Sequence, residues 1–277
     1  RAYLRWHDPS FYRGTGLVTS IYERFRDLIR SETPVVLATL IEGPNIGAKL
    51  LVEESGARMG SLGSEQLDRV IGRDAIAMLD AGTSEVRHYG PDGEARQHGL
   101  SVFIESHARR PHMVIFGAVD FTRALAGQGK LLGFRVTVCD AREVFATRRR
   151  FPMADEVVVD WPDRLLERIG DDLGPRDAVC VLTHDTKFDV PAIVGALSTR
   201  VGYLGAMGSR QTHEKRIARL VEEGVTVEEL DRVRSPIGLD IGGRTPEETA
   251  VSIVAEIIAM RTGRDAPSLS EGQGSIH

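Results

Sequence analysis

The sequence predicts an α/β protein in which a Rossmann-like domain, built on a doubly wound parallel sheet, follows a smaller N-terminal α/β domain. Three observations support this fold class. Residues 112–142 have the pattern of a βαβ unit, strand-length apolar segments alternate with helical patterns after it, and a polar break at residues 108–111 separates the halves. We predict one domain over residues 1–110, a second over 111–264, and a flexible tail over 265–277.

The composition is typical of a soluble globular protein. Of the 277 residues, 42% are hydrophobic and 27% are charged, which is enough for two domains with cores of their own. No apolar segment approaches the about 20 residues that cross a membrane, and no apolar stretch typical of a secretory signal follows the basic N-terminal residues. A net charge of -5 disfavours nucleic acid as the main partner. We therefore expect a cytoplasmic protein that binds neither membranes nor nucleic acid.

The first half of the chain carries alternating helix and strand signals. The predicted helices cover residues 17–29 and 65–80, and the predicted strands cover residues 35–41, 48–52, 86–89 and 101–104. Ser64 is placed to cap the second helix. The second strand is expected to continue as a hairpin as far as Gly60, and residues 60–64 are expected to form a flexible loop.

The second half repeats the strand-then-helix order of a parallel sheet. After the βαβ unit, strands are predicted over residues 156–160, 178–183 and 201–204, and helices over residues 161–170, 188–197, 211–223, 227–233 and 247–260. The last helix has a start signal in Thr245, Pro246 and Glu248. Because such sheets bind ligands beyond the carboxyl ends of their strands, the candidate site is expected there.

Four segments follow predicted strands and are expected to meet at that edge: residues 117–120, 140–142, 183–185 and 205–210. Main-chain amides of the first and last segments, each followed by a helix, are suited to hold an anionic group. The predicted cofactor-binding residues are Gly117, Ala118, Asp140, Arg142, His184, Asp185, Gly208, Ser209 and Arg210. Two alternatives stay open, since the glycines are equally consistent with tight turns and Ser209 with a helix cap.

Asp140 lies where the acid of a dinucleotide-binding fold meets ribose hydroxyls, and Arg142 is placed to neutralise a phosphate. The alternative is that Asp140 caps the following turn. The glycine fingerprint is incomplete, because Val119 and Thr122 stand where its second and third glycines are expected. The pattern therefore predicts the fold more firmly than the ligand.

Three residues are candidates for proton chemistry. A histidine beside a carboxylate titrates near neutrality, so His184, Asp185 and Asp189 are the catalytic candidates, with a structural, hydrogen-bonded histidine as the alternative. Cys139 and Cys180 lie in apolar strands, where buried thiols are more common than disulfides or nucleophiles. The sequence contains no cysteine-histidine cluster, and we predict no metal ligation by protein side chains. The loop of residues 235–246 carries apolar side chains between its glycines. It is expected either to cover the crevice or to seal the core under the last helix.

These motifs together resemble the XdhC/CoxI family over roughly residues 34–263. The most specific parts are Phe151-Pro152, Thr183-His184-Asp185, Tyr-Leu-Gly-Ala-Met-Gly-Ser-Arg at residues 203–210, and Pro-Ile-Gly-Leu-Asp-Ile-Gly at residues 236–242. The resemblance implies an accessory protein, often a homodimer, with a Rossmann second domain. It further implies binding of the molybdenum cofactor, its sulfuration by a cysteine desulfurase, and its delivery to an apo molybdenum hydroxylase of the xanthine dehydrogenase or carbon monoxide dehydrogenase type.

The chain departs from the family's pattern at three places. Gln66 and Asp68 stand where the family has the cysteine and glutamate of a Gly-Gly-Cys-x-Glu turn, residues 96–98 stand near an expected Cys-Gly-Gly, and Val119-Asp120 replaces Gly-His. Without those thiols the sequence indicates a divergent member that keeps the scaffold and an interaction role. An NAD(P)-dependent oxidoreductase, based on Gly117 and Asp140, and a regulatory paralogue without a ligand are the alternatives.

Overall fold

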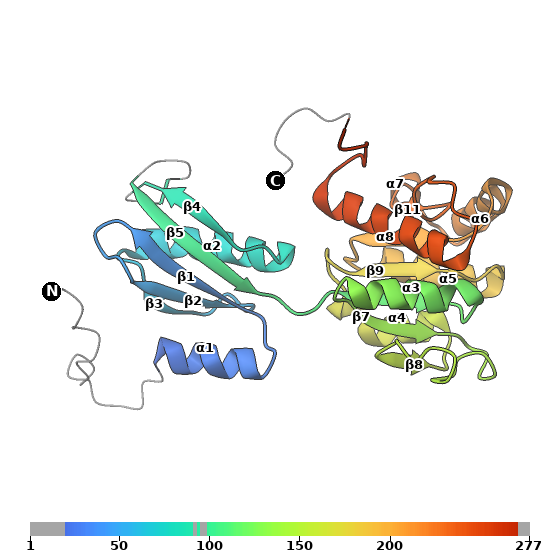
Figure 1. Ribbon diagram of the computed structural model, residues 1–277, viewed down its shortest axis with the longest axis horizontal. Helices are drawn as coiled ribbons and strands as arrows, with labels where there is room; N and C mark the ends of the chain where they lie inside the picture. The colour runs from blue at the N-terminus through green and yellow to red at the C-terminus, as the bar shows by residue number, and fades with distance from the viewer. Residues whose placement is uncertain (1–19, 91–92, 95–98, 271–277) are drawn as a thin grey trace. The chain divides into compact units, whose positions relative to one another are not determined.

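The computed structural model describes residues 20–90, 93–94 and 99–270 (Figure 1). The predicted helical positions 17–19, the segment 96–98 and most of the predicted tail, 271–277, lie outside the described residues. The chain divides into two compact units, Arg1–Arg109 and Arg110–His277, which are described one at a time.

The first unit contains a five-stranded antiparallel sheet of order β3-β2-β1-β5-β4. Its strands are β1 (Val35–Glu42), β2 (Lys49–Glu53), β3 (Arg58–Ser61), β4 (Glu85–Tyr89) and β5 (Leu100–His107). Residues 35–38 of β1 and residues 50–52 of β2 are buried on consecutive positions, so both faces of the sheet must be covered there.

One helix covers each face of this sheet. The helix α2 (Glu65–Ala81) packs Leu67, Ile71 and Ala75 onto a core that includes Val36 and Ile104. The opposite face, with Val35, Leu37 and Leu51, contacts α1 (Ile21–Arg30) through Leu28, Ile21 and Phe25. Both helices begin at a serine whose hydroxyl accepts a main-chain amide, as Ser20 does for α1 and Ser64 for α2.

The second unit contains a six-stranded parallel sheet of order β11-β10-β9-β6-β7-β8. Its strands are β6 (His112–Phe116), β7 (Arg135–Cys139), β8 (Glu156–Val158), β9 (Ala178–Val181), β10 (Tyr203–Ala206) and β11 (Val233–Arg234). Counted along the chain from β6, this is the strand order 6-5-4-1-2-3, that of a Rossmann sheet. The point where the order reverses lies between β6 and β9, so the loops after these two strands flank the expected crevice.

Helices cover both faces of this sheet, as the alternating pattern predicts. The helices α3 (Asp120–Leu131) and α8 (Pro246–Thr262) lie side by side on one face and share a core with Met113, Val136 and Cys180 (Figure 1). The other face, with Val114 and Val179, packs against α4 (Pro162–Ile169), α5 (Thr186–Leu197) and α6 (Arg210–Glu222). The remaining pieces are a 3-10 turn, Gly170–Asp172, and the short helix α7 (Val227–Leu230).

The secondary structure differs from the sequence prediction at two short segments. Gly60 and Ser61, expected in a loop, complete β3, where a Cβ on Gly60 would collide with the Lys49 carbonyl oxygen. The helix expected over residues 227–233 ends at Leu230, and Val233 and Arg234 form β11 beside β10. Both strands are too short for alternation of apolar and polar residues to identify them.

Candidate functional site

Gly117 closes β6 at the point where the strand order reverses. Its φ is +107°, and a Cβ there would lie 2.7 Å from Thr183 Cγ2 and 3.0 Å from the Thr183 nitrogen. The loops after β6 and β9 therefore touch at this position. Glycine is required both for the backbone conformation and for the close approach.

The Asp140 side chain is only 4% exposed, and its hydrogen-bond donors are main-chain amides and an arginine of the protein itself. The amides of Ala118 and Arg142 donate to it at 2.8 and 2.9 Å, and the Arg142 guanidinium donates through Nε at 2.9 Å and Nη2 at 2.7 Å. Burial alone would raise the pKa of Asp140, but these donors outweigh it and hold the pKa below its usual value. Asp140 thus joins the loops after β6 and β7.

In the loop after β6, which begins at Gly117, polar main-chain groups also have partners within the protein. The Val119 amide donates to Thr122 Oγ1 at 3.3 Å, and that hydroxyl donates to the Gly117 carbonyl oxygen. Asp120 occupies the first turn of α3 and lies 3.7 Å from the Arg150 guanidinium. A carboxylate at this helix start takes the place that the helix dipole offers to an anionic ligand.

His184 and Asp185 are exposed in the loop between β9 and α5. Asp185 is the N-cap of α5, where its carboxylate accepts the Lys187 amide at 3.2 Å and pairs with the Lys187 ammonium at 3.2 Å. The backbone hydrogen bond and this neighbouring cation lower the pKa of Asp185. Asp185 is therefore bound to its own helix start, while His184 faces solvent beside it.

Asp189 forms a buried ion pair that the sequence pattern does not predict. Asp189 Oδ2 accepts Arg216 Nη2 at 2.9 Å, and both side chains are 1% exposed. Arg216 also donates to the Met207 carbonyl oxygen at 2.7 Å and to Ser235 Oγ at 3.1 Å, so it joins α5, the loop after β10 and the segment after β11. Burial raises the pKa of Asp189 to about 6, against the opposing effect of Arg216.

Both members of this pair have a buried polar atom without a hydrogen-bond partner. Within residues 20–90, 93–94 and 99–270, the buried side-chain atoms that lack a hydrogen-bond partner are Thr183 Oγ1, Asp189 Oδ1, His213 Nδ1 and Arg216 Nε. Arg216 pairs with Asp189, and the pKa of His213 is lowered by burial and, to a smaller extent, by the charge of Arg216. Buried polar groups without partners are costly in proteins, so these atoms at the loop after β9 and on α5 and α6 are the buried groups with unused hydrogen-bonding capacity in the described residues.

Arg216 was not predicted as a site residue. The signal available was its place on the buried stripe of α6, four residues before Leu220, where a charged side chain is unexpected.

In the loop after β10, Gly208 occupies a position that a larger residue would adopt only with strain. Gly208 has φ of +146°, and a Cβ there would lie 3.1 Å from Thr212 Cγ2 and 3.5 Å from Arg216 Nη2. Ser209 Oγ accepts the Thr212 amide at 3.1 Å and caps α6, which begins at Arg210. Both alternatives from the sequence, a tight turn and a helix cap, are thus realised in this loop.

The apolar loop after β11 packs under α8. The Gly238 amide donates to Glu256 Oε2 at 2.9 Å, Ser252 Oγ donates to the Leu239 carbonyl oxygen at 2.5 Å, and the Ile237 amide donates to Ala206 at 3.1 Å. Of the two roles left open by the sequence, these contacts match sealing of the core.

Neither cysteine is placed for metal or sulfur chemistry. Cys139 and Cys180 are free and buried, and burial raises the pKa of both thiols, that of Cys139 to about 12. The described residues contain no group of three or more histidine, cysteine, aspartate or glutamate side chains able to hold a metal ion. Gln66 and Asp68 lie in the first turn of α2, where Gln66 is exposed and Asp68 accepts the Leu62 amide at 2.8 Å.

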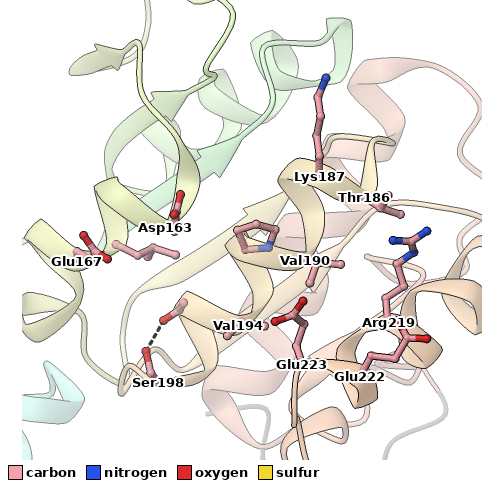
Figure 2. A pocket seen from close by; sticks show the side chains of 13 residues that line it. Asp163, Glu167, Thr186, Lys187, Val190, Val194, Ser198, Arg219, Glu222 and Glu223 are labelled. Atoms are coloured by element: carbon pink, nitrogen blue, oxygen red, sulfur yellow. Dashed lines mark hydrogen bonds between the residues drawn. The ribbon is translucent and has the colours of Figure 1, made fainter.

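A groove of about 660 Å³ runs along the outer face of α5, between α4 and α6 (Figure 2). Its floor carries Leu166, Val190, Pro191 and Val194, and its rim carries Asp163, Glu167, Lys187, Arg219, Glu222 and Glu223. The groove begins at Thr186 and Lys187, two residues after the exposed His184-Asp185 segment.

Comparisons with known proteins agree with this architecture. The chain is 26% identical to the uncharacterized protein YqeB of Escherichia coli over 254 residues, covering 87% of this chain and 46% of that protein. It is 34% identical over 161 residues to a Bacillus subtilis protein described as a probable xanthine dehydrogenase subunit, covering 58% and 46%. It is 34% identical to the molybdenum cofactor insertion chaperone PaoD of Escherichia coli over 91 residues, covering 33% and 29%. The chain therefore spans less than half the length of each of these relatives.

A crystal structure described as a xanthine dehydrogenase from Bacillus halodurans has the same fold, with a TM-score of 0.51, 23% identity, and coverage of 89% of this chain and 97% of that one. None of the helices that the structure describes has the length and apolarity to span a bilayer. The family profile for the XdhC Rossmann domain matches residues 113–257, and that for the XdhC and CoxI family matches residues 28–90. Because these matches cover both units, the chain belongs to the XdhC and CoxI family.

Proposed function

We propose that this protein assists the maturation of a molybdenum-containing hydroxylase of the xanthine dehydrogenase or carbon monoxide dehydrogenase type, by handling the molybdenum cofactor rather than by turning over a substrate. The observation that carries the proposal is family membership across both units. A relative that is named a molybdenum cofactor insertion chaperone supports it. The proposed partners are the apo-hydroxylase and a cysteine desulfurase, and the proposed assembly is a homodimer.

The two halves of the strand edge differ in the hydrogen-bonding groups that they leave available for a cofactor. On the Gly117–Asp140 side, the Ala118 amide and the Asp140 carboxylate already bind each other, so they have little left to offer a phosphate or a pterin. On the side of β9 and β10, Thr183 and His213 have polar atoms without partners, and α6 begins with amides at its positive end. We place the proposed binding site on this second side.

In that site, His184 and the amides around Ser209 would bind polar and anionic groups of the cofactor, and Arg216 would hold the loop at Met207 in place. The bound cofactor brings the redox-active molybdenum that the client enzyme uses. The buried cysteines cannot contribute a thiolate, so the chain's own role is to bind and present the cofactor.

The test is a fluorescence titration of the purified protein with molybdenum cofactor, paired with reconstitution of the apo-hydroxylase. His184→Ala should weaken binding about tenfold, because it removes a polar contact of roughly 1.4 kcal/mol. Ser209→Ala should also weaken binding, because the start of α6, whose amides would hold the anion, loses its cap. Thr226→Ala removes the equivalent cap of α7, far along the chain from the site, and should leave binding unchanged. A well-folded protein that neither binds the cofactor nor stimulates the client would refute the proposal.

NAD(P) binding is the second candidate, favoured by the Rossmann strand order. Val119 crowds the expected approach to the pyrophosphate, and Asp140 is engaged by Ala118 and Arg142, so this candidate ranks below the first. A titration with reduced nicotinamide cofactor separates the two. The third candidate, a regulatory paralogue, predicts that neither cofactor binds.

A further inference from the structure

The groove along α5 has features that the proposed function leaves unused. It extends over the whole helix from Thr186 to Ser198, a length of about 18 Å at the rise of an α-helix. Figure 2 shows Val190 and Val194 at the bottom of the groove, with Asp163 and Glu167 on one flank and Arg219, Glu222 and Glu223 on the other; Val190 is buried, and Val194 is partly exposed. An elongated apolar floor with charged flanks has the dimensions of a site for an amphipathic helix.

The rim of the groove is acidic. Four carboxylates, of Asp163, Glu167, Glu222 and Glu223, face two cationic side chains, and one of these, Lys187, is paired with Asp185 at 3.2 Å. Pro191 adds to the negative potential of the groove. It has no amide hydrogen, so the carbonyl oxygen of Lys187, one turn earlier in α5, receives no hydrogen bond from it. The rim therefore complements a cationic partner.

Two of the acids are placed unfavourably for their own helix. Glu222 is the last residue of α6 and Glu223 is its C-cap, where the helix dipole disfavours negative charge. Val221 beside them is 53% exposed. Residues that lower the stability of their own element without a local gain are candidates for a functional role.

We propose that this groove binds a basic amphipathic helix presented by another protein, with its apolar face on the partly exposed Pro191 and Val194 and its lysine or arginine side chains on the acidic rim. A second copy of this chain is disfavoured as the occupant, because its net charge of -5 repels an acidic rim. The proposal goes beyond the proposed function and needs no cofactor.

The experiment uses the full chain without cofactor and a fluorescein-labelled 15-residue peptide with leucines on one helical face and lysines beside them. Anisotropy should show saturable binding that weakens with added salt. Glu222→Lys combined with Glu223→Lys should weaken binding about tenfold. This variant should fold, since cations are favourable at a helix C-terminus.

The matched control is Glu214→Lys, the same charge change on an exposed residue of the same helix outside the groove, which should bind as the wild type does. A peptide with glutamates in place of the lysines should not bind. The inference is overturned if the lysine peptide does not bind, if the control variant weakens binding equally, or if sedimentation shows that the groove variant abolishes self-association instead.

Discussion

Gly117 and Asp140 make structural contacts within the protein. Gly117 lets the loop after β6 contact Thr183, and Asp140 accepts the Ala118 amide from the same loop. The sequence spacing of these two residues is that of a dinucleotide site, yet the structure uses them to join three loops. At the scale of single residues, the unused polar capacity lies instead around Asp189 and Arg216.

Gly117→Ala should destabilise the second unit by about 2 to 4 kcal/mol, because it combines a left-handed backbone with a Cβ 2.7 Å from Thr183. Gly133→Ala is the matched control, with φ of +81° and no atom within 4 Å of the added Cβ, and should cost only about 1 to 2 kcal/mol. Urea unfolding measures both. Equal losses would show that close packing at Gly117 contributes nothing.

Asp189 should make stability depend on pH. Its pKa is about 6 in the folded protein and 3.8 as the ordinary value, so its contribution to the free energy of unfolding is fully present below pH 3.8 and lost as the pH rises through 6. Asp189→Asn removes this titration. The stability of the variant relative to wild type should therefore increase between pH 4.5 and 7.5 in urea unfolding, and a constant difference would contradict the raised pKa.

At the scale of elements, two helix starts were predicted correctly from their caps, because a cap is a local interaction. Ser64 caps α2, and Thr245 forms a capping box with Glu248 at the start of α8, both as predicted. The hairpin of β2 and β3 was predicted as far as Gly60, whereas β11 escaped prediction because its pairing with β10 is a contact between distant segments.

Thr245→Ala should destabilise the protein by about 1 kcal/mol, because the Glu248 amide loses its acceptor at 3.2 Å. Thr249→Ala, inside the same helix, should cause no such loss, since alanine has the higher helix propensity. Thermal unfolding followed by circular dichroism compares them. A larger loss from the Thr249 substitution would contradict the role given to the cap.

At the scale of the whole molecule, each of the four hydrophobic clusters lies within one unit. Ile71→Ala should therefore cost about 2 to 5 kcal/mol in the first unit alone, and Ile193→Ala a similar amount in the second. Hydrogen exchange should show reduced amide protection in β1 and β5 for the first variant, and in β6 and β9 for the second. Loss of protection in both units from one substitution would show that they unfold together.

The sequence by itself determined the α/β class, the Rossmann architecture of the second half and the family, because periodicity, caps and strand-end motifs are local patterns. It also named the loops at the strand edge. Only the tertiary structure decided which partners these side chains have: Asp140 accepts an amide from the loop after β6, and Asp189 pairs with Arg216, 27 residues away on another helix. Hydrogen-bond partners and burial depend on which distant segments meet, and the order of residues along a chain does not contain that information.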